Sequence, residues 1–565
     1  MKTALSAAVA ATLIAAAGPA FSATPAKTLK LEVLGTFGEA KYFDEGGAEI
    51  TSYDPGTRQA FVVNAGAGTV DVLDLSDPTH PVKVAEVDVD GDLFSETGIV
   101  AGNANSVAVR RGVVAVAVQN ATKTGNGWVA FYDAADLGAG LKGWVEVGAL
   151  PDMVTFTDDG MYALTANEGE PNDLYTVDPK GSISIINLAG GVAGATVATA
   201  GFEAWDGEED ALRAQGIRIF GPGASASMDL EPEYITTAGN TAWVTLQENN
   251  ALAVIDIANA TVRAVLPLGY KDHSLERNAL DASDRDDPAP GNNGIINIAN
   301  WPVFGMYQPD AIASYQHRGR TYLVTANEGD ARVYPPGDIV GGPEEGDIIN
   351  EESRIKDLDL DPAAFPDADA LQSDLGAGRL NVTNTLGDTD GDGDVDELYA
   401  FGARSFSIWD GATGALVFES GDAIEQKMAE LLPEYFNSTN DGNDSFDNRS
   451  DNKGPEPEGV TLGRIEGRTY AFIGLERIGG VIVYDITDPR APVYMDYLNN
   501  RDFNPDADCE AFECGDLGPE GITFVAKEDS PNGQPLLIVG NEISGTTTIF
   551  GIDVRPARAQ GPKKK

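Results

Sequence analysis

Acidic residues open hydrophobic runs at intervals along this chain. Seven short polar motifs begin such runs, and six of the seven carry a carboxylate. The openings are Ala48-Glu49-Ile50, Asn105-Ser106-Val107, Pro151-Asp152-Met153, Pro232-Glu233-Tyr234, Pro309-Asp310-Ala311, Pro457-Glu458-Gly459 and Pro519-Glu520-Gly521. Carboxylates held side by side cannot all ionise without a cation or a basic partner. If the fold brings these acids together, they form a metal or ligand site.

Each opening is followed by two further hydrophobic runs. The second run ends in an amide or an acid, at Asn64, Gln119-Asn120, Asn167-Glu168, Gln247-Glu248, Asn327-Glu328, Glu476 and Asn541-Glu542. The third run reads TVDVLDL, WVAFYDA, SISIINL, LAVIDI, SFSIWD, VIVYDI and TTIFGI. Alternating β-branched and small residues predict strands, and a weaker fourth run, such as Val82–Val89, completes several units.

Repeated four-stranded units predict an all-β fold, a β-propeller in which each unit is one blade. We expect seven blades, with an eighth built from the run at Arg379–Thr383 and Leu398–Phe401 as the alternative. The last unit lacks a clear fourth strand, and the strand Lys30–Phe37 has no unit of its own. We therefore expect the N-terminal strand to close the ring in the last blade.

The remaining length must lie outside the blades. The N-terminus has the pattern of a secretory signal, with Lys2, an apolar stretch from Ala4 to Ala17 and small residues before position 24. The expected organisation is a signal peptide at 1–23, one propeller domain at 24–556 with insertions near 201–227, 269–307, 329–404 and 420–455, and a disordered basic tail at 557–565. No later apolar run approaches twenty residues, so we expect a secreted or periplasmic protein without a transmembrane anchor.

The formal charge of the chain is −51, from 89 acidic and 38 basic residues. Nucleic acid is excluded as a partner because its phosphates require a basic surface. The charge favours divalent cations as partners. The alternative explanation is a general adaptation to a salty or extracellular medium, with no specific ligand. We expect a monomer.

One acidic segment has the spacing of a calcium loop. It contains alternating carboxylates around glycines, at Asp388, Asp390, Asp392, Asp394 and Asp396. This alternation lets a chain wrap a hard cation with oxygen ligands. Tyr399 occupies the position where an EF-hand carries its last glutamate, so the pattern indicates a structural calcium loop on a β scaffold. The alternative is a solvated acidic turn.

The openings predict a second cation site. If the first strand of each blade lines the axis, one mouth of the channel is ringed by Asp152, Glu233, Asp310, Glu458 and Glu520. Nearby would lie the acids that end the second runs, Glu168, Glu248, Glu328, Glu476 and Glu542. The alternative is that each acid only caps backbone groups in its own turn. Taken as a set, so many acids at one end favour a metal or ligand site.

Basic residues occur inside the acidic segments. A cation together with guanidinium groups is what a phosphate ester requires, since both neutralise its oxygens. The catalytic candidates on this view are Glu458, Arg449, Lys453, Arg332 and His273. Ion pairing explains any one of the bases equally well. With three histidines and no Gly-x-Ser-x-Gly motif, the chain gives no support to a Ser-His-Asp triad.

The only two cysteines, Cys509 and Cys514, lie in an acidic loop. In an oxidising compartment we expect them to form a local disulfide, with metal binding or free thiols as alternatives. Their spacing does not match a zinc motif.

Long segments of the chain resemble the choice-of-anchor I family, which is related to mesenchyme-specific cell-surface glycoproteins of mineralising animals. The resemblance rests on GMYQPDAIASY, YLVTANEGDAR, DTDGDGDVDELYAFGARSFSIWD, FNSTNDGNDSFDNRSDNKGPEPEGV and GLERIGGVIVYDITDP. It implies an exported propeller, calcium association and varied surface attachment, although no C-terminal anchor is visible here. Some relatives are labelled alkaline phosphatases, but no nucleophile is identifiable in this chain.

Two functions follow as hypotheses. The first is an extracellular calcium-binding protein whose acidic face binds mineral, polysaccharide or partner proteins. The second is a calcium-dependent phosphomonoesterase acting on phosphate esters.

Overall fold

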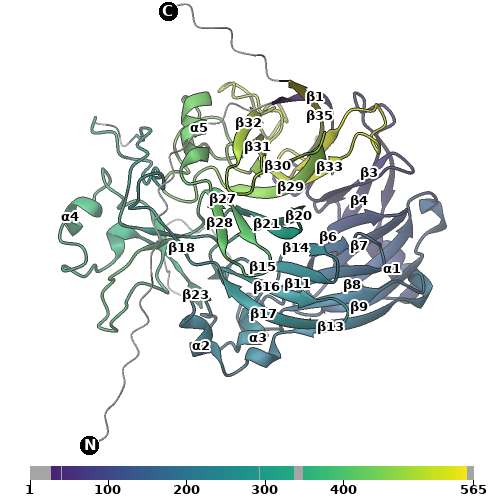
Figure 1. The fold of residues 1–565 in the computed structure, drawn as a ribbon, viewed down its shortest axis with the longest axis horizontal. Coiled ribbons are helices and arrows are strands. Elements are labelled where there is room, and N and C mark those ends of the chain that lie inside the picture. The colour runs from purple at the N-terminus through teal and green to yellow at the C-terminus, as the bar shows by residue number, and fades with distance from the viewer. Residues whose placement is uncertain (1–26, 40, 290, 292, 336–347, 557–565) are drawn as a thin grey trace, which may run out of the picture.

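Seven four-stranded antiparallel sheets surround a common centre, so the fold is a β-propeller (Figure 1). The structure is a computed structural model that describes residues 27–39, 41–289, 291, 293–335 and 348–556. The expected signal peptide and basic tail lie outside these residues. No helix among the described residues is long and apolar enough to cross a membrane.

The first four blades follow each other along the chain, each built from four consecutive strands. Their strands are β2 (Thr51–Asp54), β3 (Gln59–Asn64), β4 (Thr69–Asp74) and β5 (Val82–Val87); β6 (Ala101–Arg110), β7 (Val113–Asn120), β8 (Asn126–Asp133) and β9 (Gly143–Ala149); β10 (Pro151–Phe156), β11 (Tyr162–Asn167), β12 (Ser182–Asn187) and β13 (Thr196–Gly201); and β14 (Ile235–Ala238), β15 (Thr241–Leu246), β16 (Ala251–Asp256) and β17 (Thr261–Pro267). Helix α1 (Val89–Thr97) joins the first blade to the second.

The last three blades differ in how the chain supplies their strands. The fifth blade is interrupted by an insertion, and the seventh takes its outermost strand from the N-terminus. Their strands are β20 (Ile312–His317), β21 (Arg320–Asn327), β27 (Ser405–Asp410) and β28 (Leu416–Glu419); β29 (Pro457–Ile465), β30 (Arg468–Leu475), β31 (Val481–Asp485) and β32 (Val493–Leu498); and β33 (Pro519–Val525), β34 (Leu536–Asn541), β35 (Thr546–Pro556) and β1 (Lys27–Gly38).

Ring closure by the N-terminal strand is confirmed. Strand β1 pairs antiparallel with β35 along nearly its whole length, from Lys27 opposite Pro556 to Gly38 opposite Thr546. The pairing satisfies the outer edge of β35 and covers a strand edge that would otherwise be open. The two ends of the propeller are thereby held in one sheet.

The first strand of each blade lies innermost, and we call these seven the inner strands: β2, β6, β10, β14, β20, β29 and β33. Each contacts the next around a closed circle, in the order just given, and β33 returns to β2. Hydroxyl groups link several neighbours: Ser52 Oγ accepts from Val109 N at 2.9 Å, and Thr51 Oγ1 lies 2.9 Å from Thr523 Oγ1. This order arranges the opening strands around the axis.

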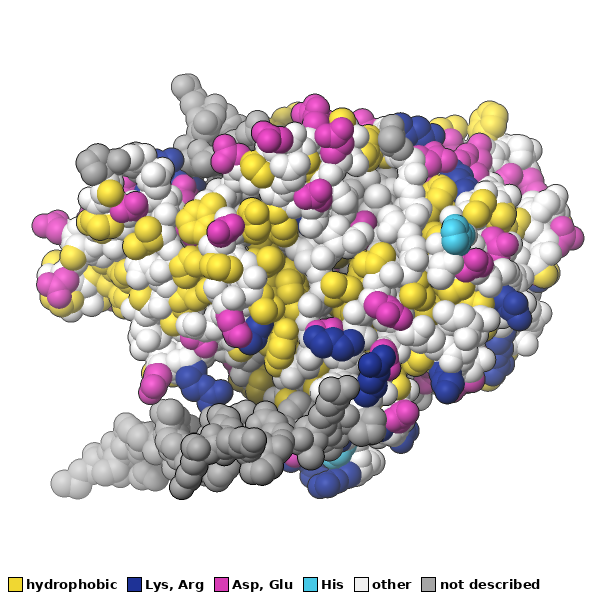
Figure 2. Space-filling model, turned by 90° about the horizontal axis from the view of Figure 1, so that it is seen from above, with side chains coloured by type: hydrophobic (Ala, Val, Ile, Leu, Met, Phe, Trp, Pro, Cys, Tyr) yellow, Lys and Arg dark blue, Asp and Glu magenta, His cyan; other side chains and the backbone are white. Residues whose placement is uncertain are grey.

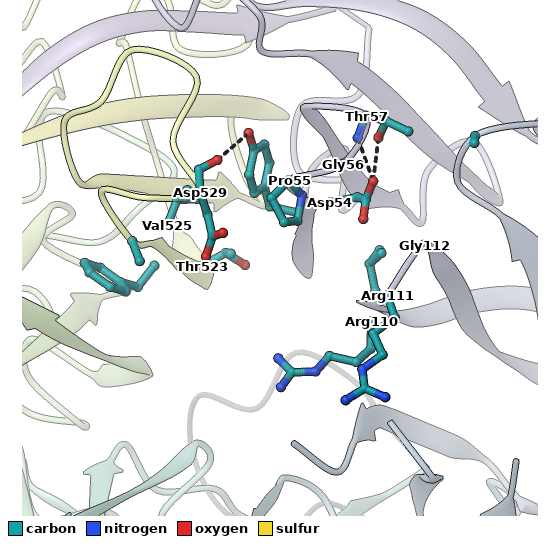
Figure 3. A pocket seen from close by; sticks show the side chains of 15 residues that line it. Asp54, Pro55, Gly56, Thr57, Arg110, Arg111, Gly112, Thr523, Val525 and Asp529 are labelled. Atoms are coloured by element: carbon teal, nitrogen blue, oxygen red, sulfur yellow. Dashed lines mark hydrogen bonds between the residues drawn. The ribbon is translucent and has the colours of Figure 1, made fainter. Parts of the chain in front are cut away.

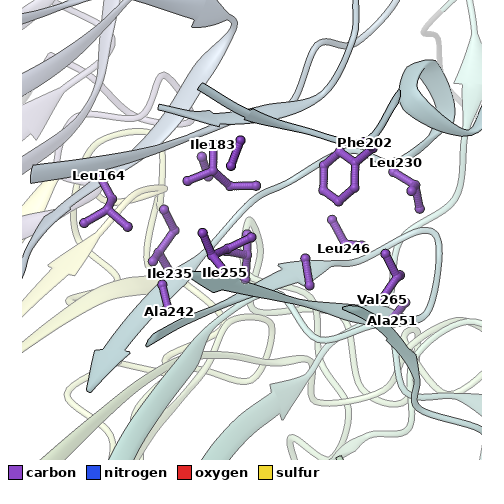
Figure 4. Close-up of a cluster of buried hydrophobic side chains, with 14 of the residues drawn as sticks. Leu164, Ile183, Phe202, Leu230, Ile235, Ala242, Leu246, Ala251, Ile255 and Val265 are labelled. Atoms are coloured by element: carbon purple, nitrogen blue, oxygen red, sulfur yellow. The ribbon is translucent and has the colours of Figure 1, made fainter. Parts of the chain in front are cut away.

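Apolar side chains from adjacent sheets form the core between blades. Figure 4 shows this contact for the third and fourth blades, where Leu164 and Ile183 face Ile235 and Ile255. These side chains are at most 3% exposed. Burying one face of a blade therefore requires its neighbour, because a single four-stranded sheet cannot bury both faces alone.

The insertions between β17 and β27 form a lobe beside the ring, at the left of Figure 1. The main element of this lobe is a five-stranded sheet, and the insertions also carry a two-stranded sheet and four short α-helices, of which α4 lies in the lobe, α2 and α3 lie at the bottom of the view and α5 lies at its top. They are β18 (Tyr270–Asp272), β19 (Phe304–Met306), β26 (Tyr399–Ala400), β25 (Asn381–Thr383) and β24 (Glu352–Arg354); β22 (Val333–Tyr334) and β23 (Ile349–Asn350); and α2 (Glu209–Arg213), α3 (Ala226–Asp229), α4 (Ala368–Leu371) and α5 (Ala423–Leu431).

The run that could have formed an eighth blade as the alternative, Arg379–Thr383 with Leu398–Phe401, lies in this five-stranded sheet and supplies β25 and β26. The sheet mixes a parallel pair, β19 with β26, into otherwise antiparallel pairing. It contributes no strand to the circle of inner strands. Seven blades therefore make the ring in the described part of the chain.

Candidate functional site: an acidic axial mouth

The five acids expected at the axis all lie where an inner strand begins. Asp152, Glu458 and Glu520 occupy the second position of β10, β29 and β33, while Glu233 and Asp310 precede β14 and β20 by two residues. Glu49 stands in the same place, two residues before β2. We call these six residues the axial acids. Because inner strands share one direction around the ring, their starting ends meet at one mouth.

Local backbone irregularities aim the acids inward. The pairing of β10 with β11 skips Asp152, and the pairing of β29 with β30 skips Glu458 and Gly459. The seventh blade repeats this, since β33 skips Glu520 and its following glycine. A bulge leaves one residue unpaired and turns its side chain away from the alternation of the strand. In these three blades the acid of the opening is therefore a bulged residue.

The glycines of the two Pro-Glu-Gly openings let neighbouring blades approach. A Cβ at Gly459 would lie 1.9 Å from the carbonyl oxygen of Glu520, and one at Gly521 would lie 2.6 Å from that of Glu49. No real Cβ comes so close to a backbone oxygen. The motif therefore places an acid at the mouth and, one residue later, removes the side chain that would separate the blades.

We expect Gly459→Ala to destabilise the fold by about 2–3 kcal/mol, because the obstructing atom belongs to backbone that cannot rotate away. Gly442→Ala is the control, because a Cβ at Gly442 would meet nothing within 4 Å and the φ of this glycine is not in the left-handed region. Thermal unfolding of both variants checks this. Equal melting temperatures for the two would contradict the close approach.

A cavity of about 270 Å³ lies inside the mouth. Four axial acids line it, together with amides and one aromatic ring, and the lining includes Glu49, Asp152, Asp310, Glu520, Asn103, Asn105, Gln119 and Tyr234. The blade whose opening lacks an acid contributes Asn105, whose Nδ2 donates to Pro151 O at 3.2 Å. The cavity is therefore lined mainly by oxygen-bearing side chains.

A larger hollow, of about 790 Å³, lies at the other ends of the inner strands. Figure 3 shows Arg110 and Arg111 reaching into it from the end of β6, with Asp54 and Asp529 on neighbouring segments. Arg110 is tied to the backbone carbonyl of Asp158. This hollow is lined by two arginines and two aspartates and by none of the axial acids. The two ends of the axis therefore differ in charge.

Burial and mutual repulsion raise the pKa values of the axial acids. The pKa of Glu49 rises to about 8, chiefly through burial and then through Glu542 and Asp152. The pKa of Asp152 rises to about 7 through burial, with Glu170 adding to it. The carboxyls of Glu233, Asp310, Glu458 and Glu520 are raised well above their usual range, in every case first by burial and then by neighbouring acids. A cation beside these carboxyls would favour their ionised form at neutral pH.

Three carboxylates at the mouth are close enough to share one cation. Oxygens of Glu49, Glu520 and Glu542 all lie within 4.8 Å of one another. One oxygen each of Glu233, Glu458 and Glu520 is shielded from solvent and has no hydrogen-bond partner among the described residues. Carboxylate oxygens without donors are what a hard cation binds. The residues present therefore fit calcium or a similar ion.

The amides that end the second runs have a structural role. Asn167 is fully buried and its Nδ2 donates to Ser182 O at 3.0 Å and to Ser184 Oγ at 3.0 Å. Asn327 repeats this arrangement with Ser405 and Ser407. Each amide pins the second strand of its blade to the third. The acids that follow the amides do not share this structural role. The pKa of Glu168, for example, is raised well above its usual range, first by burial and then by the axial acid Asp152.

Two basic candidates lie beside the mouth but are already paired. Lys453 Nζ lies 2.5 Å from Glu328 Oε1 and 3.1 Å from Glu456 Oε2, and Arg449 binds Glu456. Arg477 completes the group with Glu456 and Glu476. Glu328, Glu456 and Glu476 also have oxygens within 4.8 Å of one another. Because three bases neutralise them, this second cluster does not need a metal ion.

The other two basic candidates lie elsewhere. Arg332 is buried against Asp229 and Glu231, at 2.5 and 2.6 Å. His273 is buried beside the five-stranded sheet, where its Nδ1 lies 2.6 Å from Asn278 O and burial holds its pKa well below the usual range. Neither residue lines the axial cavity.

The expected calcium loop forms an exposed turn at the surface of the lobe. Oxygens of Asp388, Asp390 and Asp392 lie within 4.8 Å of one another. The loop is preformed by its own hydrogen bonds: Asp388 Oδ1 accepts from Gly391 N at 2.7 Å, and Asp396 Oδ2 accepts from Thr389 N at 2.7 Å. Burial and the neighbouring Asp392 raise the pKa of Asp394 to about 6. This arrangement also fits calcium, with Asp394 and Asp396 at its border.

The cysteine prediction is confirmed, because Cys509 and Cys514 form a disulfide. The bond closes the loop before β33, next to Leu517 and Ile543.

Two acids of the mouth were missing from the predicted metal set. The sequence shows Glu49 as an opening and Glu542 as the end of a second run, but only the structure brings both next to Glu520. The repeat pattern does not predict a role for Glu456 or Arg477. In the sequence, Glu456 is only a second acid two residues before Glu458, and Arg477 is only a base directly after Glu476. Their ion pair becomes apparent once the structure places the two segments side by side.

Comparison with known proteins places the chain in a family. The model of the choice-of-anchor I domain matches residues 49–489, which is most of the chain. The chain belongs to the choice-of-anchor I family. The resemblance stated from its long motifs is thereby confirmed.

Two curated relatives match this choice-of-anchor I protein over part of its length. Gigasin-3a of Magallana gigas is 30% identical over 191 residues, covering 32% of this chain and 67% of the relative. The mesenchyme-specific cell surface glycoprotein of Strongylocentrotus purpuratus is 29% identical over 310 residues, covering 50% of this chain and 38% of the relative. The chain thus spans about two thirds of the first relative and little more than a third of the second.

Among solved structures, the Cps50 (Swd1) β-propeller domain of Myceliophteria thermophila is similar to the chain at 9% identity and a TM-score of 0.40. The match covers 92% of this chain and 99% of that domain. A likeness this distant concerns the fold alone.

Proposed function

We propose that this choice-of-anchor I protein is an extracellular calcium-binding β-propeller that uses a cation at its acidic axial mouth to bind an anionic ligand. The observation that carries the proposal is the convergence of Glu49, Glu520 and Glu542 within 4.8 Å beside carboxylate oxygens that have no donor. A calcium ion held there would accept further oxygen ligands, because calcium takes more ligands than three carboxylates supply. Carboxylate or sulfate groups of a polysaccharide, or a mineral surface, could occupy them.

An extracellular location agrees with two observations. The disulfide between Cys509 and Cys514 suits an oxidising compartment. One relative is a cell surface glycoprotein. The acidic side chains are spread over the face shown in Figure 2 rather than gathered into one patch, so net charge alone does not mark the binding site. The localised feature is the mouth.

Binding of calcium at the mouth is tested by equilibrium dialysis of the chelator-stripped chain. We expect Glu520→Gln to lose one calcium ion per chain, because an amide supplies one neutral oxygen where the carboxylate supplied charge. Glu528→Gln is the matched control, since Glu528 is exposed on the segment that follows β33. Equal calcium content in wild type and Glu520→Gln would refute the axial site.

The exposed loop is expected to bind a separate calcium ion. Combining Asp390→Asn with Asp392→Asn removes two of three clustered carboxylates, so we expect calcium content to fall by one ion and the melting temperature in calcium to change by at most a few degrees, because the loop lies at the surface of the lobe. Asp367→Asn, an exposed acid elsewhere in the same insertion, is the control. Full calcium content in the double variant would leave this segment as a solvated acidic turn.

Phosphomonoesterase activity is the alternative. Its phosphate-binding candidates Arg449, Lys453 and Arg332 are each engaged with buried acids, so a phosphate ester would have to open one of those pairs. A chromogenic phosphate ester, offered to the stripped chain with and without calcium, tests it. Turnover that requires calcium and disappears in Glu458→Gln would favour the enzyme over the binding protein.

A further inference from the structure

A second charged feature lies at the end of the axis opposite the mouth, where each inner strand turns into the second strand of its blade. We call this the hairpin end. Five of its seven hairpins carry an exposed base that forms no ion pair and no side-chain hydrogen bond among the described residues. These bases, which we call the basic arc, are Arg58, Arg111, Arg318, Arg464 and Lys527. Unpaired bases gathered at one end need an explanation in a chain with a formal charge of −51.

The five hairpins are neighbours around the ring. They belong to the fifth, sixth, seventh, first and second blades, whose inner strands β20, β29, β33, β2 and β6 contact one another in that order. The hairpin of the third blade carries Asp158 and Asp159, and that of the fourth carries Gly239 and Asn240. The basic arc is therefore continuous over five blades and is interrupted only at the third and fourth.

Turn geometry does not account for these bases. Arg58, Arg111 and Arg318 have positive φ values of 60, 52 and 50°. Turns usually place Gly, Asn or Asp at such positions, because those residues tolerate the left-handed conformation best. Three long cationic side chains therefore stand where the backbone favours small or acidic residues, so the reason for them must lie in their charge.

A hollow of about 410 Å³ lies between the fifth and sixth blades at the hairpin end, and its lining includes no carboxylate. Arg318 and Arg464 line it together with His317, Thr469 and Thr487. Thr487 Oγ1 accepts from Thr469 N at 3.0 Å, and its own hydroxyl hydrogen has no acceptor among the described residues. Two free guanidinium groups beside a hydroxyl donor provide the charge and the hydrogen bonds that a sulfate or carboxylate group binds.

Two acids of the sixth blade that follow these lining residues along the chain are already paired with other bases. Glu466, in the hairpin itself, pairs with Lys27 of the N-terminal strand. Asp485, two residues before Thr487, pairs with Arg468. The two arginines of the hollow therefore keep their charge for a ligand.

The larger hollow of about 790 Å³ continues the basic arc across the seventh, first and second blades. Arg110 and Arg111 line it, and Figure 3 shows both side chains reaching into it. Of its two acids, Asp54 is buried and accepts from the backbone N and the hydroxyl of Thr57, at 2.8 and 2.9 Å. Asp529 is then the one exposed carboxylate of the lining, against two guanidinium groups.

The acids elsewhere on the molecule limit the shape of the partner. The turns between the third and fourth strands lie farther from the axis at the same end, and they carry exposed acids, for example Asp77, Asp136 and Asp488. A flat anionic surface would meet these acids, whereas a narrow chain can follow the basic arc inside them. The axial acids are too far away to repel such a chain, because a six-residue strand such as β10 spans about 20 Å, roughly twice the screening length in 0.1 M salt.

We propose that the hairpin end binds an acidic polysaccharide, whose sulfate or carboxylate groups lie along the basic arc and enter its two hollows. A polysaccharide of this kind is narrow and repeats its acidic groups, as the arc repeats its bases. Binding requires no metal ion, because the arc supplies the positive charge itself. The proposal is therefore independent of a cation at the axial mouth, and the two ends of the axis bind their ligands under different conditions.

The test measures binding of the full chain, in chelator, to immobilised dextran sulfate and polygalacturonate, with neutral dextran as the blank. We expect binding to at least one acidic polymer, and we expect Arg111→Gln/Arg318→Gln/Arg464→Gln to weaken it about tenfold at low salt, since each exposed charge contributes modestly. Arg277→Gln is the matched control, because Arg277 is equally exposed and without an ion pair but lies between β18 and β19. Melting temperatures should be unchanged in both variants, because the replaced side chains form no hydrogen bond or ion pair within the described residues.

Four results would overturn the proposal. The first is equal affinity of wild type and the triple variant for the polymers, or no binding to either polymer. The second is binding that requires calcium or is lost in Glu520→Gln, which would assign the polymer to the axial mouth. The third is equally strong binding to phosphatidylglycerol vesicles that the triple variant also weakens, which would make a membrane the partner. The fourth is self-association without polymer that the triple variant abolishes, which would make a second copy of the chain the partner.

Discussion

The calcium-free protein should lose thermal stability as the pH rises from 5 to 8, and millimolar calcium should restore most of that loss. The cause is the set of axial acids. Glu49 and Asp152 have pKa values of about 8 and about 7 in the folded chain, against roughly 4 in an unfolded chain. Over this range the folded chain holds more protons than the unfolded chain.

The sign follows from linkage. Stability falls with pH wherever the folded state binds more protons, so the contribution of each raised carboxyl is fully present near pH 4 and is lost as the pH passes its folded pKa. Glu458 and Glu520 act in the same direction. His273 acts in the opposite direction, because its lowered pKa costs stability only below about pH 6.5. One histidine does not outweigh several acids.

The measurement is a series of melting curves in chelator and in calcium, at pH 5, 6, 7 and 8. We expect the melting temperature in chelator to fall by several degrees and the fall to shrink in Glu49→Gln/Glu520→Gln, which removes two of the groups that release protons. Glu528→Gln should behave as wild type. A melting temperature in chelator that is flat or rises across this range would show that the axial acids are ionised without a metal.

Replacing Arg332 with alanine should destabilise the fold by about 3–5 kcal/mol, the cost typical of leaving buried charges without their partner. Its guanidinium binds both Asp229 and Glu231 and stacks at 4.7 Å on the ring of Phe220. This ion group joins the segment before β14 to the insertion that follows β21. Arg332 is also a candidate for binding a phosphate ester. A structural role predicts that its loss destabilises the fold, whereas a catalytic role predicts that its loss weakens ester binding and leaves stability unchanged.

Denaturant unfolding of Arg332→Ala and Arg320→Ala distinguishes the two roles. Arg320 lies at the start of β21, the strand before the insertion that holds Arg332, but its side chain is 67% exposed and pairs with Asp410 only at 3.6 Å, so we expect its loss to cost less than about 1 kcal/mol. An Arg332→Ala protein as stable as wild type, with weakened binding of a phosphate ester, would support the catalytic assignment.

Much of the fold is predictable from the sequence, because each blade repeats the same polar and apolar order. The third runs appear as the third strands of the blades, for example TVDVLDL as β4 and VIVYDI as β31. Closure by the N-terminal strand was predictable from an unmatched strand and an incomplete last unit. The five-stranded sheet was not, because its short strands pair across long insertions and β19 joins β26 in parallel.

The candidate site was predictable in part for the same reason. Inner strands of a propeller run in the same direction, so an acid at the start of each one lies at the same end of the axis. The repeat therefore predicts the axial mouth. The repeat does not predict which charged side chains form ion pairs with one another. Arg449 and Lys453 neutralise Glu456 and Glu328 across different segments, and the sequence does not show which acids those bases reach.

The sequence by itself determined that this chain is a propeller with an acidic mouth, because residue order within each repeat controls strand alternation and strand direction. Only the tertiary structure decided which acids remain without partners. Hydrogen bonding and ion pairing depend on contacts across hundreds of residues, such as that of Glu49 with Glu520, and distance along the chain carries no information about them. Those unpartnered oxygens are where cations are expected.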